Sequence, residues 1–378
     1  MLRSLFALIG LALFFILAPA SAAPAPVVPA INAKGHLLMD FHSGQILAEK
    51  NAGQRMEPAS LTKMLTSYVV DAELAKGNIR LDSEVTISEK AWRMEGSRMF
   101  VEVGTKVSVE QLLKGMIVQS GNDATVALAE FVAGSEDAFV SLMNQHATEL
   151  GMTNSHFMNS SGLPHKNHYT TPRDLATLAQ ALIRDFPEHY EWYAEKQFTY
   201  NNISQYNRNR LLWRNEYVDG IKTGHTDSAG YCLVASMLRD DMRLIAVVLG
   251  TNSEEARAEE TQKLLGFGFR FFETHRLYAA NEALTTARIW KGESEQLPLG
   301  LGQDLYLTIP RGQYKKLDAA MQIDTRIIAP AKKGDSFGSV NISLESQPVA
   351  QRKLVALTDV PPGSLWTKLV DEVKLLLE

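Results

Sequence analysis

The pattern of hydrophobic and polar positions changes twice along the chain, and each part predicts different elements. After a hairpin predicted over residues 35–48, the first part favours helices. A capping box of Ser108 and Gln111, a cap at Ser135 and the pair Thr171-Pro172 mark three helix starts. The predicted helices cover residues 60–76, 109–118, 123–132, 136–150 and 172–184.

Strand patterns follow from about residue 220. Strands are predicted over 220–224, 231–237 and 243–250, and residues 239–241 form the turn between the last two. Ser253 then caps a long helix that is predicted to run to about His275. Helices followed by an antiparallel sheet and a closing helix predict an α/β fold of the α+β kind, with helices packed on the sheet.

The last part of the chain has short alternating runs separated by proline and glycine. This spacing predicts a small all-β domain over residues 286–360. The rest of the chain is expected to divide into a signal peptide over 1–22, a catalytic domain over 23–285 and a terminal helix over 361–378.

The terminal helix is predicted to be amphipathic, with seven apolar side chains within about 140° of arc. They are Leu365, Trp366, Leu369, Val370, Val373, Leu376 and Leu377. Such a face fits either a membrane surface or the neighbouring β domain. Because the polar face holds two lysines against three acids, apolar burial would have to provide the membrane binding.

The amino terminus has the order of parts that is typical of a secretory signal peptide. Arg3 precedes an apolar stretch over residues 5–17, and the A-x-A pattern Ala20-Ser21-Ala22 follows it. This stretch is shorter than the ~20 residues that span a bilayer. We therefore expect cleavage after about Ala22 and a protein that works outside the cytoplasm.

Composition excludes several classes of protein. The chain has 378 residues, 45% of them hydrophobic and 21% charged, which is ordinary globular usage. Its formal net charge of -5 argues against a role in coating nucleic acid. The single cysteine, Cys232, can form no internal disulfide and is predicted to be a small buried side chain.

The first motif with chemical meaning is Ser60-Leu61-Thr62-Lys63. Residues three apart share a helix face, so Lys63 can place its amine beside the Ser60 hydroxyl. Serine becomes a nucleophile when a base takes its proton, and a lysine with a lowered pKa can be that base. Alone, the motif also fits a capping serine with a solvated lysine.

Two further motifs follow in a fixed order. Ser120-Gly121-Asn122 lies in a break between helices, and Lys222-Thr223-Gly224 lies on a predicted strand. Each is weak alone, but the three together are the S-x-x-K, S-x-N and K-T-G set of penicillin-recognising serine enzymes.

From about Ala33 to its end, the chain resembles the low-molecular-mass penicillin-binding proteins, a family of serine-type D-alanyl-D-alanine carboxypeptidases. Beyond the three motifs, the resemblance rests on the stretches around them. These are Pro58-Ala59-Ser60-Leu61-Thr62-Lys63-Met64, Ser120-Gly121-Asn122-Asp123-Ala124, Asn207-Arg208-Asn209 and Val218-Asp219-Gly220-Ile221-Lys222-Thr223-Gly224-His225-Thr226.

The resemblance implies a penicillin-binding, β-lactamase-like transpeptidase domain and a role for each matching residue. Ser60 would be the acylated nucleophile and Lys63 its base, while Ser120 and Asn122 would assist proton transfer and hold the substrate. The terminal carboxylate of the peptide would bind a set of polar side chains from two further stretches. These are Lys222, Thr223 and Arg208.

The resemblance also implies an oxyanion hole made by the backbone N–H groups of Ser60 and His225, next to Gly224. Gly162-Leu163 and Arg173-Asp174 resemble a family loop beside the active site. His165 and His168 follow in a polar loop and are expected at the surface.

Other reactions fit the sequence less well. The lysine motifs already supply a base, which argues against a Ser-His-Asp triad, and the chain has no H-E-x-x-H zinc motif. A class A β-lactamase would need a glutamate followed four residues later by asparagine, and none of the glutamates between the second and third motifs has one. We therefore expect slow β-lactam turnover. A DD-endopeptidase with the same residues, and a cell-wall scaffold with an inactive site, remain alternatives.

The expected activity is removal of the terminal D-alanine from peptidoglycan stem pentapeptides, with a role in cell-wall synthesis and cell shape. The expected partners are the stem peptide, β-lactams and, through the terminal helix, the outer face of the cytoplasmic membrane. No metal, organic cofactor or nucleic acid is expected. The resemblance places the exported protein in the periplasm.

Overall fold

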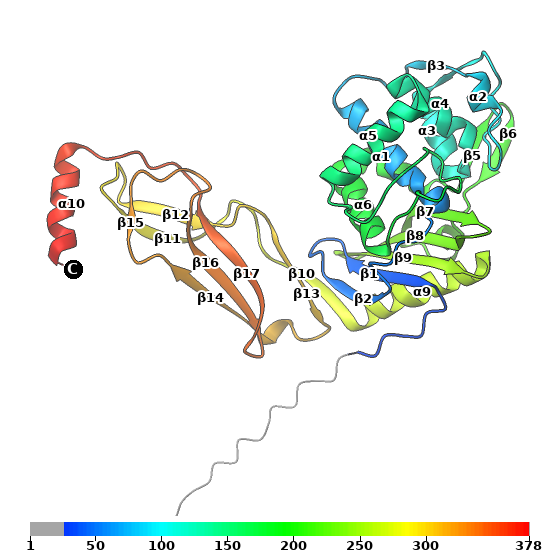
Figure 1. Cartoon of the computed structure of the whole chain (residues 1–378). Helices are drawn as coiled ribbons and strands as arrows, with labels where there is room; N and C mark the ends of the chain where they lie inside the picture. Colours follow the sequence, from blue (N-terminus) through cyan, green and yellow to red (C-terminus); the bar gives the residue numbers. More distant parts are fainter. Residues whose placement is uncertain (1–25, 378) are drawn as a thin grey trace, which may run out of the picture.

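The computed structural model describes residues 26–377, so the predicted signal peptide lies outside the described residues. Figure 1 shows helices on a sheet, then an elongated β domain and a helix at its far end. The predicted α+β fold, followed by an all-β domain and a C-terminal helix, is confirmed. The domain bounds stay predictions.

An antiparallel sheet of five strands, ordered β2-β1-β9-β8-β7, is the centre of the first domain. Alternate residues of its strands enter two separate cores. Val247 of β9 packs with the helical group, whereas Val248 packs with the opposite helix, α9. The strands are β1 (Gly35–Asp40), β2 (Ile46–Lys50), β7 (Val218–Thr226), β8 (Gly230–Arg239) and β9 (Met242–Thr251).

The helical group covers one face of this sheet, and its predicted capping residues Ser108, Ser135 and Thr171 all accept the expected backbone bonds. Its main helices are α1 (Lys63–Ala75), α3 (Val109–Lys114), α4 (Asn122–Ala133), α5 (Glu136–Glu149) and α6 (Pro172–Asp185). The shorter ones are α2 (Glu89–Trp92), α7 (Pro187–Tyr190), α8 (Leu211–Arg214) and the turns η1 (Ala59–Thr62) and η3 (Glu191–Ala194). Two small antiparallel strand pairs complete this group: β3 (Glu84–Thr86) with β4 (Lys106–Ser108), and β5 (Gln197–Tyr200) with β6 (Ile203–Tyr206).

Two helices end at residues other than those predicted. The helix predicted over 109–118 becomes a π-helical turn, η2 (Gly115–Gln119), after Lys114. The helix predicted to reach His275 was too long, because α9 (Glu254–Phe271) ends earlier. Residues 272–278 form strand β10, whose backbone pairs with β13 (Leu305–Pro310) instead of continuing the helix.

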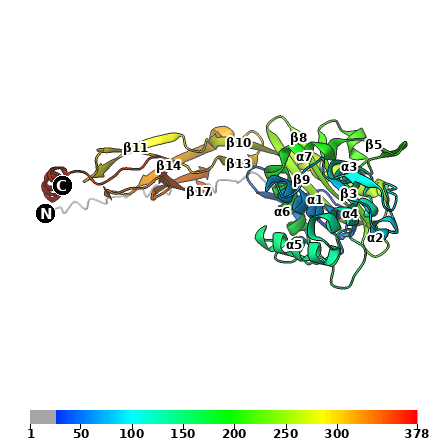
Figure 2. The same ribbon diagram turned by 90° about the horizontal axis from the view of Figure 1, so that it is seen from above.

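The second domain is a six-stranded sheet, ordered β14-β16-β17-β12-β11-β15, next to the β10–β13 ribbon. Its strands are β11 (Ala283–Trp290), β12 (Gln296–Gly300), β14 (Leu317–Ile323), β15 (Ile327–Ile328), β16 (Ser336–Leu344) and β17 (Gln347–Ala356), and η4 (Tyr314–Lys316) precedes β14. Figure 2 shows this domain as a thin extension that holds its last helix far from the first domain.

That last helix, α10 (Leu365–Leu377), presents its apolar side chains to solvent. Leu365 is 85% exposed and Trp366 76%. Its opposite side faces the β domain, where the buried carboxylate of Asp371 accepts the backbone N–H of Lys291 at 2.6 Å. The apolar face of α10 therefore does not pack on the β domain, which was one of the two surfaces considered for it. No helix among residues 26–377 is both long and apolar enough to cross a membrane.

Candidate active site

Ser60 and Lys63 are brought together by the start of α1. The short turn η1 carries Ser60, and Lys63 begins α1 directly after it. The Nζ atom of Lys63 lies 3.0 Å from Ser60 Oγ, as the spacing of three residues predicts.

Lys63 is almost completely buried and has two further acceptors. Its Nζ lies 2.7 Å from Asn122 Oδ1 and 2.6 Å from the carbonyl oxygen of Ser161. Burial, with a contribution from the charge of Arg208, lowers the pKa of Lys63 to about 7. Half of the Lys63 amine is thus neutral near pH 7, which a general base requires.

Ser120 and Asn122 face this pair from the break between η2 and α4. Ser120 has left-handed backbone angles, with φ at 67°, and these end the π-helical turn. Its Oγ is buried and has no hydrogen-bond partner among the described residues. Such a hydroxyl remains available to a substrate or to a proton in transfer.

The third motif lies on β7, beside the turn that carries Ser60. A β-carbon on Gly224 would be 3.0 Å from the carbonyl oxygen of Pro58, so the glycine lets the strand approach η1 closely. Lys222 is buried, and burial, with the nearby cations, lowers the pKa of its amine well below the usual value. Thr223, the next residue, is buried at the wall of a cleft.

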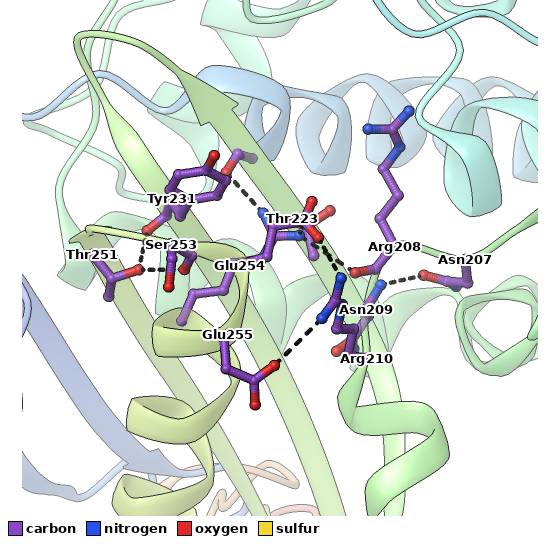
Figure 3. A network of polar contacts seen from close by, with 12 residues as sticks. Asn207, Arg208, Asn209, Arg210, Thr223, Tyr231, Thr251, Ser253, Glu254 and Glu255 are labelled. Carbon is purple, nitrogen blue, oxygen red and sulfur yellow. Dashed lines mark hydrogen bonds and ion pairs between the residues drawn. The ribbon is translucent and has the colours of Figure 1, made fainter.

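Arg208 is exposed because its two neighbours are fixed in the interior. Asn207 donates to the carbonyl oxygen of Glu195 at 3.0 Å, and Asn209 donates to that of Gly220. Figure 3 shows the Arg208 guanidinium pointing away from Arg210, which instead reaches the acids at the start of α9.

These groups surround a cleft of about 260 Å³. Most of the predicted site residues line it, and the two lysines lie buried in its surroundings. The predicted residues in the lining are Ser60, Ser120, Asn122, Gly162, Leu163, Arg208, Thr223, Gly224 and His225. The ring of His225 stacks on that of Tyr231 at 4.0 Å between centroids.

Two expectations about neighbouring residues were wrong. Arg173 and Asp174, expected in a loop beside the active site, lie instead at the start of α6, and neither lines the cleft. Arg173 pairs with Glu49 at 2.6 Å, and Asp174 accepts from the hydroxyl of Ser155. His168 is not at the surface but only 3% exposed, although His165 is exposed as predicted.

Sequence reasoning missed three groups that shape the site. Asp123, near the start of α4, is buried and accepts the backbone N–H groups of residues 99–101, which holds that loop against α4. Arg257 of α9 lines the cleft although it is only 4% exposed. Ser161 contributes only a backbone carbonyl, which no side-chain motif could reveal.

The arrangement defines a class of protein. A serine hydroxyl within hydrogen-bond distance of a lysine with a lowered pKa, in a cleft with the cations of Arg208 and Arg257, fits a serine hydrolase for an anionic substrate.

A model of the D-alanyl-D-alanine carboxypeptidase family matches residues 20–253, and a model of the penicillin-binding protein 5 C-terminal domain matches residues 272–362. The chain belongs to the D-alanyl-D-alanine carboxypeptidase family, and it is a serine-type carboxypeptidase that acts on peptidoglycan.

Curated relatives match nearly the whole chain. The D-alanyl-D-alanine carboxypeptidase DacA of Escherichia coli is 46% identical over 93% of this chain and 89% of its own length. The enzyme DacC of the same organism is 44% identical over 99% and 96%.

Solved structures support the same family assignment. Penicillin binding protein 5 from Haemophilus influenzae is 42% identical and superposes with a TM-score of 0.85 over 90% of this chain and 99% of that chain. Penicillin-Binding Protein D2 from Listeria monocytogenes, solved in its ampicillin-bound form, is 30% identical with a TM-score of 0.59 over 64% of this chain and 98% of that chain.

Proposed function

We propose that this chain is exported and removes the terminal D-alanine from stem pentapeptides through an acyl-enzyme on Ser60. One observation carries the proposal: the Lys63 amine, with a pKa of about 7, lies 3.0 Å from the Ser60 hydroxyl. A neutral amine at this distance can accept the hydroxyl proton as the oxygen attacks a carbonyl carbon.

The proposed reaction has two halves. In the first, Ser60 Oγ bonds to the carbonyl carbon of the D-Ala-D-Ala amide while its proton passes to Lys63. The C–N bond then breaks, and the departing D-alanine amine takes that proton from Lys63 through Ser120, which leaves Lys63 neutral again. In the second, a water molecule gives a proton to Lys63 and bonds to the ester carbon, the bond from that carbon to Ser60 Oγ breaks, Ser60 takes the proton back from Lys63, and the shortened peptide leaves with a free carboxylate.

The cleft supports the assignment of binding roles. Backbone N–H groups of Ser60 and His225 are proposed to hold the oxyanion, and Asn122 the amide of the peptide. The terminal carboxylate is proposed to bind Thr223, Lys222 and Arg208, and the positive charge of Arg208 supplements that of Arg257 in the same cleft.

β-Lactams are proposed to acylate Ser60 in the same way, and the ampicillin-bound relative supports this extension. The test is the intact mass of the protein after brief incubation with penicillin, beside Ser60→Ala. A stable gain of one penicilloyl group that is absent from the variant is the expected result. Rapid consumption of penicillin without an adduct would instead indicate a β-lactamase, and no reaction at all an inactive scaffold.

We also propose that α10 attaches the exported protein to the outer face of the cytoplasmic membrane. The exposed Leu365, Trp366 and Leu369 support this, because so much apolar surface is costly in water. Removal of the chain after Pro362 should release the protein into the soluble fraction. A matched control, Thr367→Ser on the side of α10 that faces the β domain, should leave membrane binding unchanged, whereas membrane-bound truncated protein would contradict the proposal.

A further inference from the structure

The loop over residues 157–168 lies against the turn that carries Ser60. Its Ser161 carbonyl accepts from Lys63 at 2.6 Å, and its Ser160 carbonyl accepts from Thr66 at 2.7 Å. Gly162 of the same loop lines the cleft. Any movement of the loop would therefore change both the surroundings of the Lys63 amine and the wall of the cleft.

His168 connects the end of this loop to that turn. Its Nε2 lies 2.9 Å from the hydroxyl oxygen of Thr62, and its Nδ1 accepts the backbone N–H of Met158 at 3.3 Å. A backbone N–H only donates, so Nδ1 carries the lone pair and Nε2 carries the proton, which it donates to Thr62. Thr62 is fully buried and stands between Ser60 and Lys63 in the sequence.

The surroundings of His168 favour this neutral form. The ring of Phe157 packs edge-on against the imidazole. Burial, followed by the neighbouring His165 and His156, lowers the pKa of His168 to about 4. A protonated ring would also place an N–H at Nδ1 against the N–H of Met158, so the bridge requires the neutral ring.

We propose that His168 is a positioning residue for acyl transfer, which fixes Thr62 and Met158 so that Ser60, Lys63 and the Ser161 carbonyl keep their geometry. The proposal rests on the proposed acyl transfer at Ser60. It concerns the chemical step rather than substrate affinity, because His168 does not line the cleft.

The test compares kcat and KM on a D-Ala-D-Ala peptide for wild type, His168→Leu, His168→Gln and Thr62→Val. Leucine removes both hydrogen bonds, whereas a glutamine amide can accept from Met158 and donate to Thr62. We expect kcat to fall by roughly 10- to 100-fold for His168→Leu, with KM within about twofold, since small misplacements of reacting groups cost that much. His168→Gln should recover most of kcat.

The pH profile and a double variant separate positioning from general stability. If the loop loosens, water reaches Lys63 and its pKa rises, so the rising limb of kcat should move to higher pH in His168→Leu and Thr62→Val. The double variant, His168→Leu with Thr62→Val, should have a kcat no lower than that of the worse single variant, because both substitutions break the same hydrogen bond between His168 and Thr62. His165→Leu, in the same loop but exposed, should match wild type.

Clear outcomes would overturn the proposal. One is a kcat within twofold of wild type in folded His168→Leu. The other is a set of additive losses of kcat in the double variant, together with an unchanged pH profile of kcat. If His168→Leu does not fold, Thr62→Val and His168→Gln decide the question by the same criteria. An inactive wild type that forms no adduct at Ser60 would instead overturn the proposed function.

Discussion

Gly162 lies directly against the carbonyl group of Ala59, the residue before the proposed nucleophile. A β-carbon built on Gly162 would be 1.8 Å from the Ala59 oxygen and 3.0 Å from the backbone nitrogen of Ser60. Gly162 also has a φ of 89°, which side-chain-bearing residues rarely adopt. The loop and the nucleophile turn can therefore touch only because this residue has no side chain.

Gly162→Ala should accordingly displace either the loop or η1. We expect the rate of acylation by penicillin to fall about 100-fold or more, because the reacting groups lose their alignment. The control is Gly151→Ala, which has a similar φ of 79° but no atom within 4 Å of the added β-carbon. That variant should lose about 1 kcal/mol of stability and keep its acylation rate. Equal rates in the two variants would contradict the steric argument.

Acylation should rise with pH through about 7, the pKa to which burial lowers Lys63. The neutral amine is the active form, so the rate at pH 6 should be roughly one tenth of the plateau reached above pH 8. The measurement is the rate of penicillin adduct formation between pH 5.5 and 9. A flat profile over that range would exclude Lys63 as the base.

Lys63→Arg provides the matched control for that profile. It keeps the positive charge but cannot lose its proton at any working pH. We expect a loss of about 10²- to 10⁴-fold in acylation, which is what a positioned general base contributes. Acylation near the wild-type rate would mean that the charge matters rather than the base.

The stability of the first domain should fall as the pH drops below about 6.5. His168 has a folded pKa of about 4, whereas the unfolded chain takes up a proton near its ordinary value of 6.5. The unfolded state therefore binds more protons between these values, and the free energy of unfolding should fall by about 2 kcal/mol from pH 7 to pH 5. Urea unfolding at the two pH values measures it. His168→Gln should abolish this part of the pH dependence, and an unchanged dependence would refute its assignment to His168.

Asp40 should anchor the junction between the two domains. It is fully buried at the end of β1, where it accepts from the backbone and hydroxyl of Ser43 and from the hydroxyl of Thr274 at 2.7 Å. Asp40→Ala would leave the backbone N–H of Ser43 without its acceptor and both hydroxyls with only Thr308 as a partner, and it should cost about 3 kcal/mol. Thermal unfolding and limited proteolysis near residue 272 would detect the loss.

Asp40→Asn keeps one acceptor oxygen and should lose less stability than Asp40→Ala. Asp318→Ala, which changes an exposed aspartate of β14, should change neither the melting temperature nor the proteolysis pattern. If Asp40→Ala behaved like Asp318→Ala, the junction would be held by other contacts.

Local signals predicted most of the elements. The caps at Ser108, Ser135 and Thr171 depend on neighbouring residues, and all three helices begin where these residues stand. The end of α9 was missed because the pairing of Phe272 with Pro310 of β13 is a long-range contact. His168 was misplaced for a similar reason, since a polar loop sequence does not reveal that it folds over Thr62.

The sequence by itself determined the local part of the chemistry. Ser60 and Lys63 share a helical turn, so their spacing was enough to predict that their side chains meet. Only the tertiary structure decided that the Ser161 carbonyl and Arg257 join them, because these groups are about 100 and 200 residues away and carry no motif. It also decided the burial that lowers the pKa of Lys63 to about 7, since desolvation depends on everything packed around the amine.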